Sequence, residues 1–149
     1  MTDDPQTYGK EVDIRHASCV ALNGRGCLIL GASGSGKSSL ALSLMALGAM
    51  LVSDDRVALH RTPSAVIASA PPQLGGLVEA RGVGLLRCEF LGQVAVDVVV
   101  DMNRAETARY PDQRCIDVLG LDLPLLYRVD APHFAPALAQ FLRCGRHED

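Results

Sequence analysis

The run from Gly31 to Ser38 combines glycines, a lysine and a serine in a spacing that suits phosphate chemistry. It matches the pattern G-x-x-x-x-G-K-[ST] without deviation. Glycines let backbone N–H groups turn inward around an anion, and the N-terminus of a following helix adds partial positive charge. We expect Lys37 to reach the β- and γ-phosphates of a nucleoside triphosphate, and the Ser38 hydroxyl to bind Mg²⁺. The predicted cofactor-binding residues are Gly31, Ala32, Ser33, Gly34, Ser35, Gly36, Lys37 and Ser38.

The segments around this loop favour a phosphate site over the simpler alternative, a Gly/Ser turn that happens to precede a helix. An apolar stretch from Cys27 to Leu30 predicts a strand that enters the loop. From Lys37 to Leu47, apolar residues recur at three- and four-residue spacing, and Gly48 follows as a helix stop. Strand, loop and helix in this order are the setting that phosphate binding requires.

Two adjacent carboxylates, Asp54 and Asp55, follow the next predicted strand, Ala49 to Val52. A right-handed crossover through the helix makes this strand parallel to the first one, so both strands end at the same edge of the sheet. At least one carboxylate should therefore lie near the phosphates. Adjacent side chains alternate sides, so we expect one to face the metal and the other the incoming nucleophile. The alternative is that Asp-Asp simply makes a turn.

Glu79 is a third candidate carboxylate, and it lies in the glycine-rich, otherwise apolar segment from Gly75 to Gly84. We expect it to help Ser38 hold Mg²⁺, because this ion prefers oxygen ligands. The alternatives are that Glu79 pairs with Arg81 or is solvated.

The remaining pattern predicts an α/β fold, a P-loop-containing mixed sheet with flanking helices, as one domain over residues 1–149 with residues 1–11 as a loose lead-in. Residues 103–112 are polar and show neither helical nor strand periodicity. The further predicted elements are a strand at Ile14 to Leu22 joined to the entering strand by an Asn-Gly turn, strands at Arg56 to His60, Val66 to Ala70, Val94 to Asp101, Cys115 to Leu119 and Leu121 to Leu126, and a helix at Pro132 to Arg143.

The bulk composition excludes several classes of protein. A net charge of -3 without a basic run argues against nucleic acid as a partner. No apolar stretch reaches the roughly 18 residues of a membrane span, and the N-terminus is polar and acidic, so we expect a cytoplasmic protein. The five cysteines are odd in number and widely spaced, which argues against disulfides or zinc and predicts buried, small apolar side chains.

In order along the chain, these motifs resemble the catalytic domain of HPr kinase/phosphorylase, the bacterial enzyme that phosphorylates a serine of the phosphocarrier HPr. The resemblance runs from His16 to Tyr110. It includes the P-loop, the Asp-Asp pair within Gly48 to Val57, and Leu-Val-Glu-Ala-Arg-Gly-Val-Gly at 77–84. It implies ATP and Mg²⁺ as cofactors, HPr as partner, a hexamer, and a short form that lacks the family's N-terminal domain.

The resemblance also implies roles for individual residues. Asp55, or alternatively Asp54, would accept the proton of the target serine, and the same group would return it in phosphorolysis. His16 matches the family's catalytic-site histidine, although a lone histidine near a strand is otherwise more often structural. Arg109 matches an arginine that steadies the transferring phosphoryl group. Since Leu121 to Arg128 retains only a Pro and an Arg of the segment associated with dephosphorylation, kinase activity is the main expectation.

Two other functions fit the same residues. One is a P-loop kinase for a small hydroxylated metabolite, because a fold does not fix a substrate. The other is a nucleotide-responsive binding module that has lost turnover.

Overall fold

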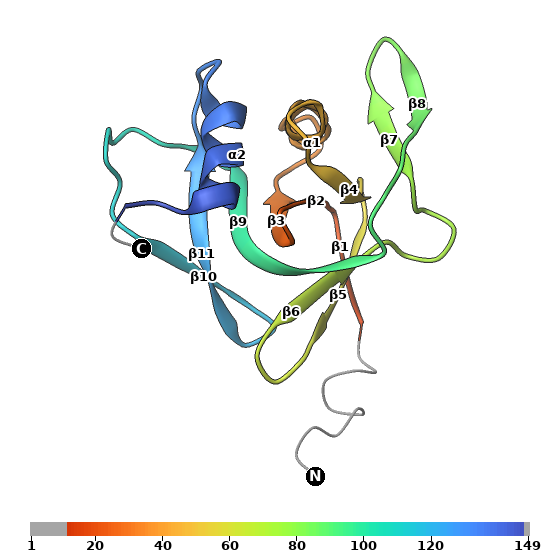
Figure 1. The fold of residues 1–149 in the computed structure, drawn as a ribbon, viewed down its shortest axis with the longest axis horizontal. Coiled ribbons are helices and arrows are strands. Elements are labelled where there is room, and N and C mark those ends of the chain that lie inside the picture. The colour runs from red at the N-terminus through yellow and green to blue at the C-terminus, as the bar shows by residue number, and fades with distance from the viewer. Residues whose placement is uncertain (1–11, 148–149) are drawn as a thin grey trace.

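One long, strongly curved strand organises the sheet in the computed structural model, which describes residues 12–147. This strand is β9 (Gln93–Ala105), and its valine-rich sequence suits a strand that is buried on both faces. It pairs with β6 (Val66–Ser69) near its start, with β3 (Arg25–Leu30) along its middle and with β11 (Leu121–Arg128) along its second half. Figure 1 shows β9 bending between these partners, so that one strand joins several parts of the sheet.

The remaining strands complete a mixed sheet with the order β1-β5-β6-β9-β3-β2-β4, to which β11 and β10 are added beside β9. Among the strand pairs of residues 12–147, only β3–β9 and β11–β9 are parallel. The predicted P-loop-containing α/β fold with a mixed sheet is therefore confirmed. The other strands are β1 (Asp13–Arg15), β2 (Ala17–Leu22), β4 (Met50–Ser53), β5 (Val57–Arg61), β10 (Arg114–Val118), and β7 (Leu77–Ala80) with β8 (Gly84–Arg87), which form a separate hairpin.

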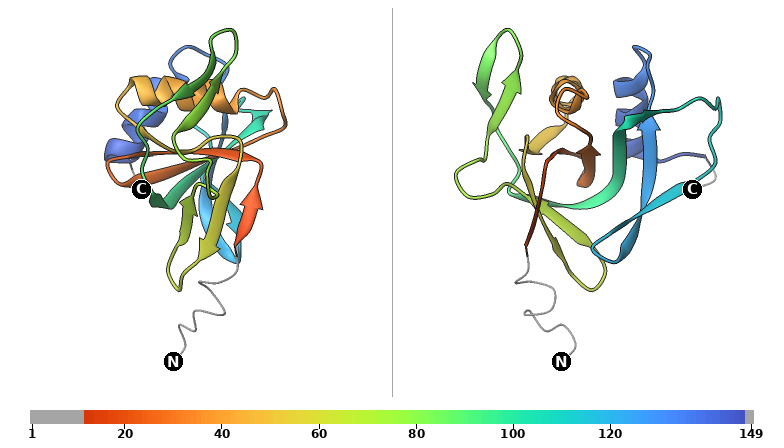
Figure 2. Two further views of the ribbon diagram at one scale, coloured as in Figure 1. Left: turned by 90° about the vertical axis from the view of Figure 1, so that its right-hand side faces the viewer. Right: turned by 180° about the vertical axis from the view of Figure 1, so that it is seen from behind.

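Both helices, α1 (Lys37–Ala46) and α2 (Phe134–Cys144), cover the same face of the sheet, as Figures 1 and 2 show. Leu44 of α1 and Leu138 of α2 are buried with Ile29 of the sheet in one apolar cluster. Burying one such side chain contributes about 1.5–3 kcal/mol. This packing fixes α1, and with it the loop at its N-terminus.

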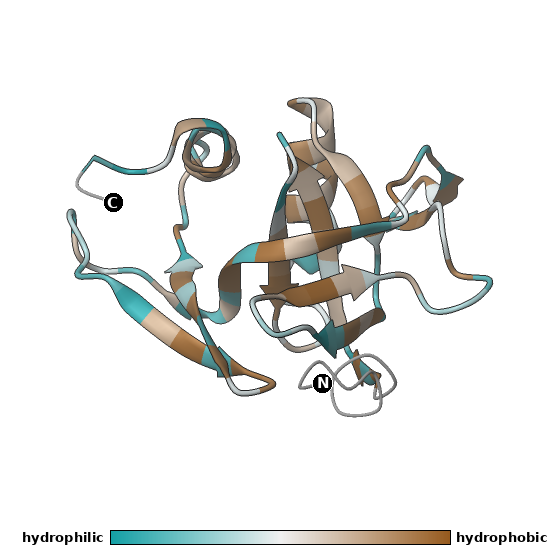
Figure 3. Cartoon of the chain, turned by 60° about the horizontal axis from the view of Figure 1, so that its bottom comes forward, coloured by the Kyte–Doolittle hydropathy of each residue, from teal (hydrophilic) through white to brown (hydrophobic). Residues whose placement is uncertain are grey.

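A second apolar cluster lies on the opposite face, between the central strands and strands β5, β6, β10 and β11. Leu28 of β3 faces this cluster, whereas its neighbour Ile29 faces the helices. The central strands are thus buried on both faces, which explains their continuous apolar runs. Figure 3 shows the same distribution, with hydrophobic colouring along the central strands and hydrophilic residues in the loops.

β4 runs parallel to β3, as predicted, although the two strands are not neighbours. β2 lies between them and is antiparallel to both. Because β3 and β4 point the same way, the segments that follow them emerge at the same edge of the sheet. This edge brings the loop after Leu30 and the residues after Ser53 together.

Several element boundaries differ from the sequence predictions. The predicted helix after the glycine-rich loop is confirmed, and Gly48 follows it with φ 108°. The single strand predicted at Ile14 to Leu22 is wrong, because the chain breaks at His16 and its two parts pair with different strands. The glycine-rich segment around Glu79 forms the β7–β8 hairpin, and β9 continues to Ala105. The lead-in predicted at 1–11 lies outside the described residues.

The cysteines only partly behave as expected. All five are free thiols, and Cys19 and Cys27 are buried in the core. Burial raises the pKa of Cys27 to about 12, so this thiol is neutral and acts as a small apolar group. Cys115 and Cys144 are exposed, so the prediction of burial is wrong for them. Neither helix in the described part of the chain has the length and apolar character of a membrane span.

Candidate active site

The loop between β3 and α1 has the backbone geometry of a phosphate cradle. Gly34 and Gly36 have φ values of 81° and 101°, in the left-handed region that favours glycine. A Cβ at Gly31 would lie 2.4 Å from the Ser35 Oγ, so no other residue fits there without a shift. The loop is also tied to β9, since the Ala32 N–H donates a hydrogen bond of 2.9 Å to the Asn103 side chain.

Lys37, the first residue of α1, is 6% exposed and carries its ammonium group beneath the loop. Its Nζ donates to the carbonyl oxygens of Gly31 at 2.8 Å and Ala32 at 3.0 Å. A buried charge needs such partners to offset its lost hydration. The lysine therefore stabilises the loop and places a positive charge where an anion would bind.

Asp54 connects the loop to the end of β4. Its carboxylate is 8% exposed and accepts hydrogen bonds from the Ser38 hydroxyl at 2.8 and 3.0 Å. It also accepts one from the Ser18 hydroxyl at 2.6 Å and one from the Glu79 backbone N–H at 3.1 Å. Both carboxylate oxygens are engaged, so Asp54 orients the side chain of Ser38 and has no free side that faces an incoming substrate.

Asp55 has the opposite environment, although it is the next residue. Its φ is 70°, and its side chain is 69% exposed. The Asp55 Oδ1 lies 2.8 Å from the Nε2 of His16, which is placed by the break between β1 and β2. Because an ionised carboxylate only accepts hydrogen bonds, His16 donates through Nε2. The structure separates the two aspartates by exposure, and the predicted division between a metal-side and a substrate-side aspartate stays a prediction.

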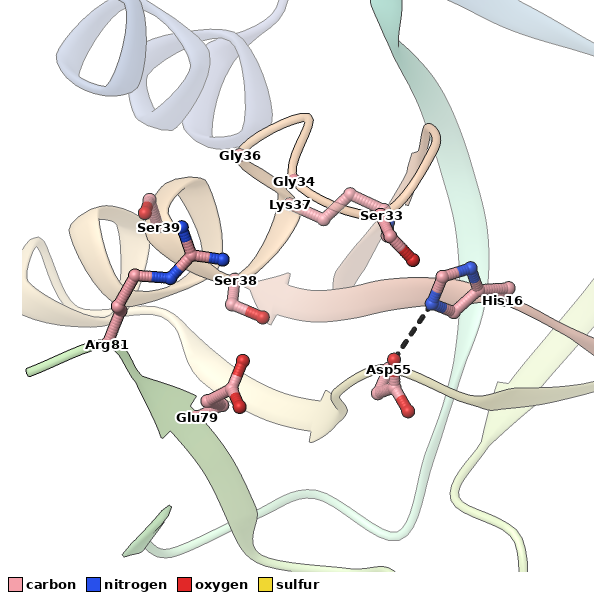
Figure 4. Close-up of a pocket in the computed structure, with 10 residues that line it drawn as sticks. All are labelled: His16, Ser33, Gly34, Gly36, Lys37, Ser38, Ser39, Asp55, Glu79 and Arg81. Carbon is pink, nitrogen blue, oxygen red and sulfur yellow. Dashed lines mark hydrogen bonds and ion pairs between the residues drawn. The ribbon is translucent and has the colours of Figure 1, made fainter. Parts of the chain in front are cut away.

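One open cavity of about 280 Å³ is lined by the loop, Lys37, Ser38, Asp55 and His16, and Figure 4 shows its lining residues. Asp54, which accepts hydrogen bonds from Ser38, is not among them. Glu79, from β7, turns its carboxylate toward Ser38. No group of three or more His, Cys, Asp or Glu in the described residues could hold a metal by itself. Mg²⁺ usually uses one or two carboxylates together with substrate phosphates, so Ser38 and Glu79, which both line the cavity, fit this ion.

Arg109 is not among the residues that line the cavity. It lies in the connection between β9 and β10, 5.3 Å from the centre of the Tyr110 ring, and lines a different hollow with Tyr110 and Asp112. Within this single chain the structure does not bring it to Lys37 or Asp55, so its role stays a prediction. Arg81, which sequence analysis considered only as a partner for Glu79, is the arginine that lines the cavity.

Glu106 holds the connection that carries Arg109. Its side chain is 7% exposed and accepts hydrogen bonds from Arg114 and from the N–H groups of Thr107 and Ala108. Arg114 in turn lies 4.1 Å from the centre of the Tyr127 ring. The hydrogen bond from Arg114, aided by the backbone donors, lowers the pKa of Glu106 below its usual value.

A Glu106→Gln variant is therefore expected to be less stable than the wild-type chain at pH 7. Since the folded-state pKa is lowered, the carboxylate stabilises the fold above its ordinary pKa of about 4. This contribution is lost as the pH falls through the lowered folded-state pKa. Urea unfolding at a series of pH values checks this, with the gap between the two proteins closing toward low pH. A gap that stays constant with pH would contradict it.

Three contributors to the site were missed by sequence reasoning. Ser18 reaches Asp54 from β2, and Asn103 reaches the loop from β9. Neither residue belongs to a phosphate-binding or metal-binding motif. They reach the site only because of the way β2 and β9 pair with neighbouring strands. Arg81 had a usable signal, because it follows the candidate metal ligand Glu79 by two residues in a glycine-rich turn.

Comparisons with known proteins agree with this geometry. The family model for the HPr Serine kinase C-terminal domain matches residues 9–113. An HPr kinase/phosphorylase from Peptoclostridium acidaminophilum is 36% identical and one from Cupriavidus necator 38% identical, over 78% and 74% of this chain. The chain spans only 39% and 38% of those two proteins. The solved structure of the Hpr(Ser) kinase/phosphatase from Coxiella burnetii has a TM-score of 0.76 at 23% identity and covers 88% of each chain, which confirms the fold.

Proposed function

The chain belongs to the HPr Serine kinase C-terminal domain family, and from this membership we propose that it transfers the γ-phosphoryl group of ATP, with Mg²⁺, to a serine hydroxyl of the phosphocarrier HPr. Its relatives carry the name HPr kinase/phosphorylase, although they are longer than this chain. The proposal also includes one catalytic unit over residues 1–149, a cytoplasmic location, a homo-oligomer and no nucleic-acid partner.

The observation that carries the proposal is the pair of hydrogen bonds between the Ser38 hydroxyl and Asp54, at 2.8 and 3.0 Å. They tie the P-loop to the end of β4, beside a cavity that Ser38, Asp55 and Glu79 line. Phosphoryl transfer requires this arrangement, since it depends on positioning and on neutralising charge. Asp55 is the adjacent residue and faces the open side.

The residues have separate roles in the proposed reaction. The loop amides and Lys37 hold the polyphosphate, while Ser38 and Glu79 would hold Mg²⁺, which compensates phosphate charge when bound. Asp54 orients Ser38 through its hydrogen bonds. Asp55 accepts the proton of the serine hydroxyl while the serine oxygen forms a bond to the γ-phosphorus. The bond between the γ-phosphorus and the oxygen that it shares with the β-phosphate breaks at the same time. His16 donates a hydrogen bond to Asp55 at 2.8 Å and so orients this base.

Phosphorolysis, a separate reaction, uses the same groups. Inorganic phosphate attacks phosphoserine to give pyrophosphate, and Asp55 returns the proton to the serine oxygen. The role of Arg109 in steadying the phosphoryl group remains part of this proposal, although in the single chain this residue lines another hollow.

The test is to mix the chain with γ-labelled ATP, Mg²⁺ and HPr and to analyse the label. Acid-stable phosphoserine on HPr is the expected product. Label on a small hydroxylated metabolite and none on HPr would favour a metabolite kinase. ATP binding without any transfer would favour a nucleotide-binding module, and either result would overturn the proposal.

A further inference from the structure

Arg81 lies in the turn after β7 and lines the cavity at the end remote from Asp55. We propose that Arg81 binds the leaving-group side of the nucleotide, at its α- and β-phosphates. The inference rests on the nucleotide site proposed above and adds a residue to it.

The arrangement of the cavity gives the polyphosphate a direction. Figure 4 shows His16 and Asp55 at one end, with Arg81 and Ser39 at the other. Lys37 lies between them. The reacting γ-phosphoryl group must lie beside the base, Asp55. The rest of the phosphate chain must therefore extend toward Arg81.

The guanidinium of Arg81 is free to bind an anion. Within residues 12–147 it makes no hydrogen bond or ion pair with the protein, and it does not pair with Glu79. Gly82 and Gly84 follow it with φ values of 88° and 137°, and a Cβ at either position would meet nothing within 4 Å. The turn that follows Arg81 is therefore uncrowded at both glycines.

The hairpin that carries Arg81 is nevertheless anchored to the site. Val78 of β7 is 1% exposed and packs in the cluster beneath α1, with Leu86 of β8 partly buried against the same cluster. The Glu79 N–H donates to Asp54, the carboxylate that also binds Ser38. The backbone that carries Arg81 is thus held in a fixed position relative to the P-loop.

The chemistry of the position suits an arginine. When the bond to the γ-phosphorus breaks, negative charge increases on the β-phosphate of the departing nucleoside diphosphate. A planar guanidinium can form two parallel hydrogen bonds to phosphate oxygens, which lysine cannot reproduce. Arg81 would therefore favour both nucleotide binding and departure of the leaving group.

The test measures the affinity of the full chain for ADP and for ATP, each with Mg²⁺, by calorimetry. Arg81→Gln is expected to weaken both affinities by about tenfold, since a hydrogen bond to a charged group is lost. The matched control is Arg87→Gln, on β8 of the same hairpin, because Arg87 lines a different hollow with Met50 and Phe90. This control should stay within about twofold of wild type.

Three results would overturn the inference. Weaker binding of ATP but not of ADP would place Arg81 at the γ-phosphate. Equal losses in the Arg81 and Arg87 variants would indicate general electrostatic attraction, and unchanged affinity in the Arg81 variant would exclude a contact. If the wild-type chain bound neither nucleotide, the proposed function would fail together with this inference.

Discussion

An Asp55→Asn variant is expected to transfer phosphoryl groups to serine about 10²–10⁴-fold more slowly than wild type, while its affinity for ATP changes by no more than about twofold. The amide cannot accept the proton of the attacking hydroxyl. The side chain is 69% exposed and its only hydrogen bond within the described residues is to His16, so the substitution should leave the fold and the P-loop intact.

The measurement is the initial rate of label transfer to HPr, with ATP affinity determined on the same protein. Asp122→Asn is a suitable control, because this exposed carboxylate of β11 is not among the residues that line the cavity. Asp122→Asn should retain the full rate. An Asp55→Asn protein that transfers phosphate as fast as wild type would exclude Asp55 as the base.

Replacing Lys37 by methionine is expected to lower the affinity for ATP about 100-fold and to abolish transfer. Methionine is similar in length but carries no charge, so the hydrogen bonds of a charged donor to the phosphates are lost, at about 1.5–3 kcal/mol each. The same change removes the donor to the carbonyl oxygens of Gly31 and Ala32, at 2.8 and 3.0 Å. The loop is therefore expected to lose order as well.

Calorimetric titration with ATP and Mg²⁺ checks this prediction, with thermal unfolding of both proteins as the control for folding. The Lys37→Met chain should unfold in one transition at a slightly lower temperature than wild type. Wild-type affinity in a folded Lys37→Met chain would mean that the loop does not hold the polyphosphate.

The sequence predicted those parts of the fold that depend on local chemistry and on chain direction. The strand, loop and helix around Gly31 to Ser38 follow from a motif whose residues interact with one another. The nearness of Asp54 to Ser38 follows from a crossover that makes two strands parallel. That β2 lies between these strands was not predictable, because strand order depends on pairing between distant segments.

The same limit explains what was missed in the site. Ser18 contacts Asp54 only because β2 pairs with β4 in one register, and sequence patterns do not reveal a register. Arg109 was assigned by resemblance through a segment without periodicity, and in this chain it lines another hollow. Arg81 lines the cavity because the glycine-rich segment forms the β7–β8 hairpin. The sequence did not predict this hairpin, because its many glycines hide the strand pattern.

The structure also separates two aspartates that the sequence could not rank. Asp54 is buried and accepts hydrogen bonds from Ser18, Ser38 and the Glu79 backbone. Asp55 is exposed and contacts His16. The hydrogen bonds of Asp54 suit it to orienting Ser38, and the exposure of Asp55 leaves it as the aspartate that the proposed function uses as the base.

A crystal structure of the chain with a non-hydrolysable ATP analogue and Mg²⁺ would test the central claim most directly. The account predicts that the phosphates lie in the loop above Lys37, with the γ-phosphate at the end of the cavity formed by Asp55 and His16. Phosphates bound away from Lys37, or a γ-phosphate at the opposite end beside Arg81, would contradict it.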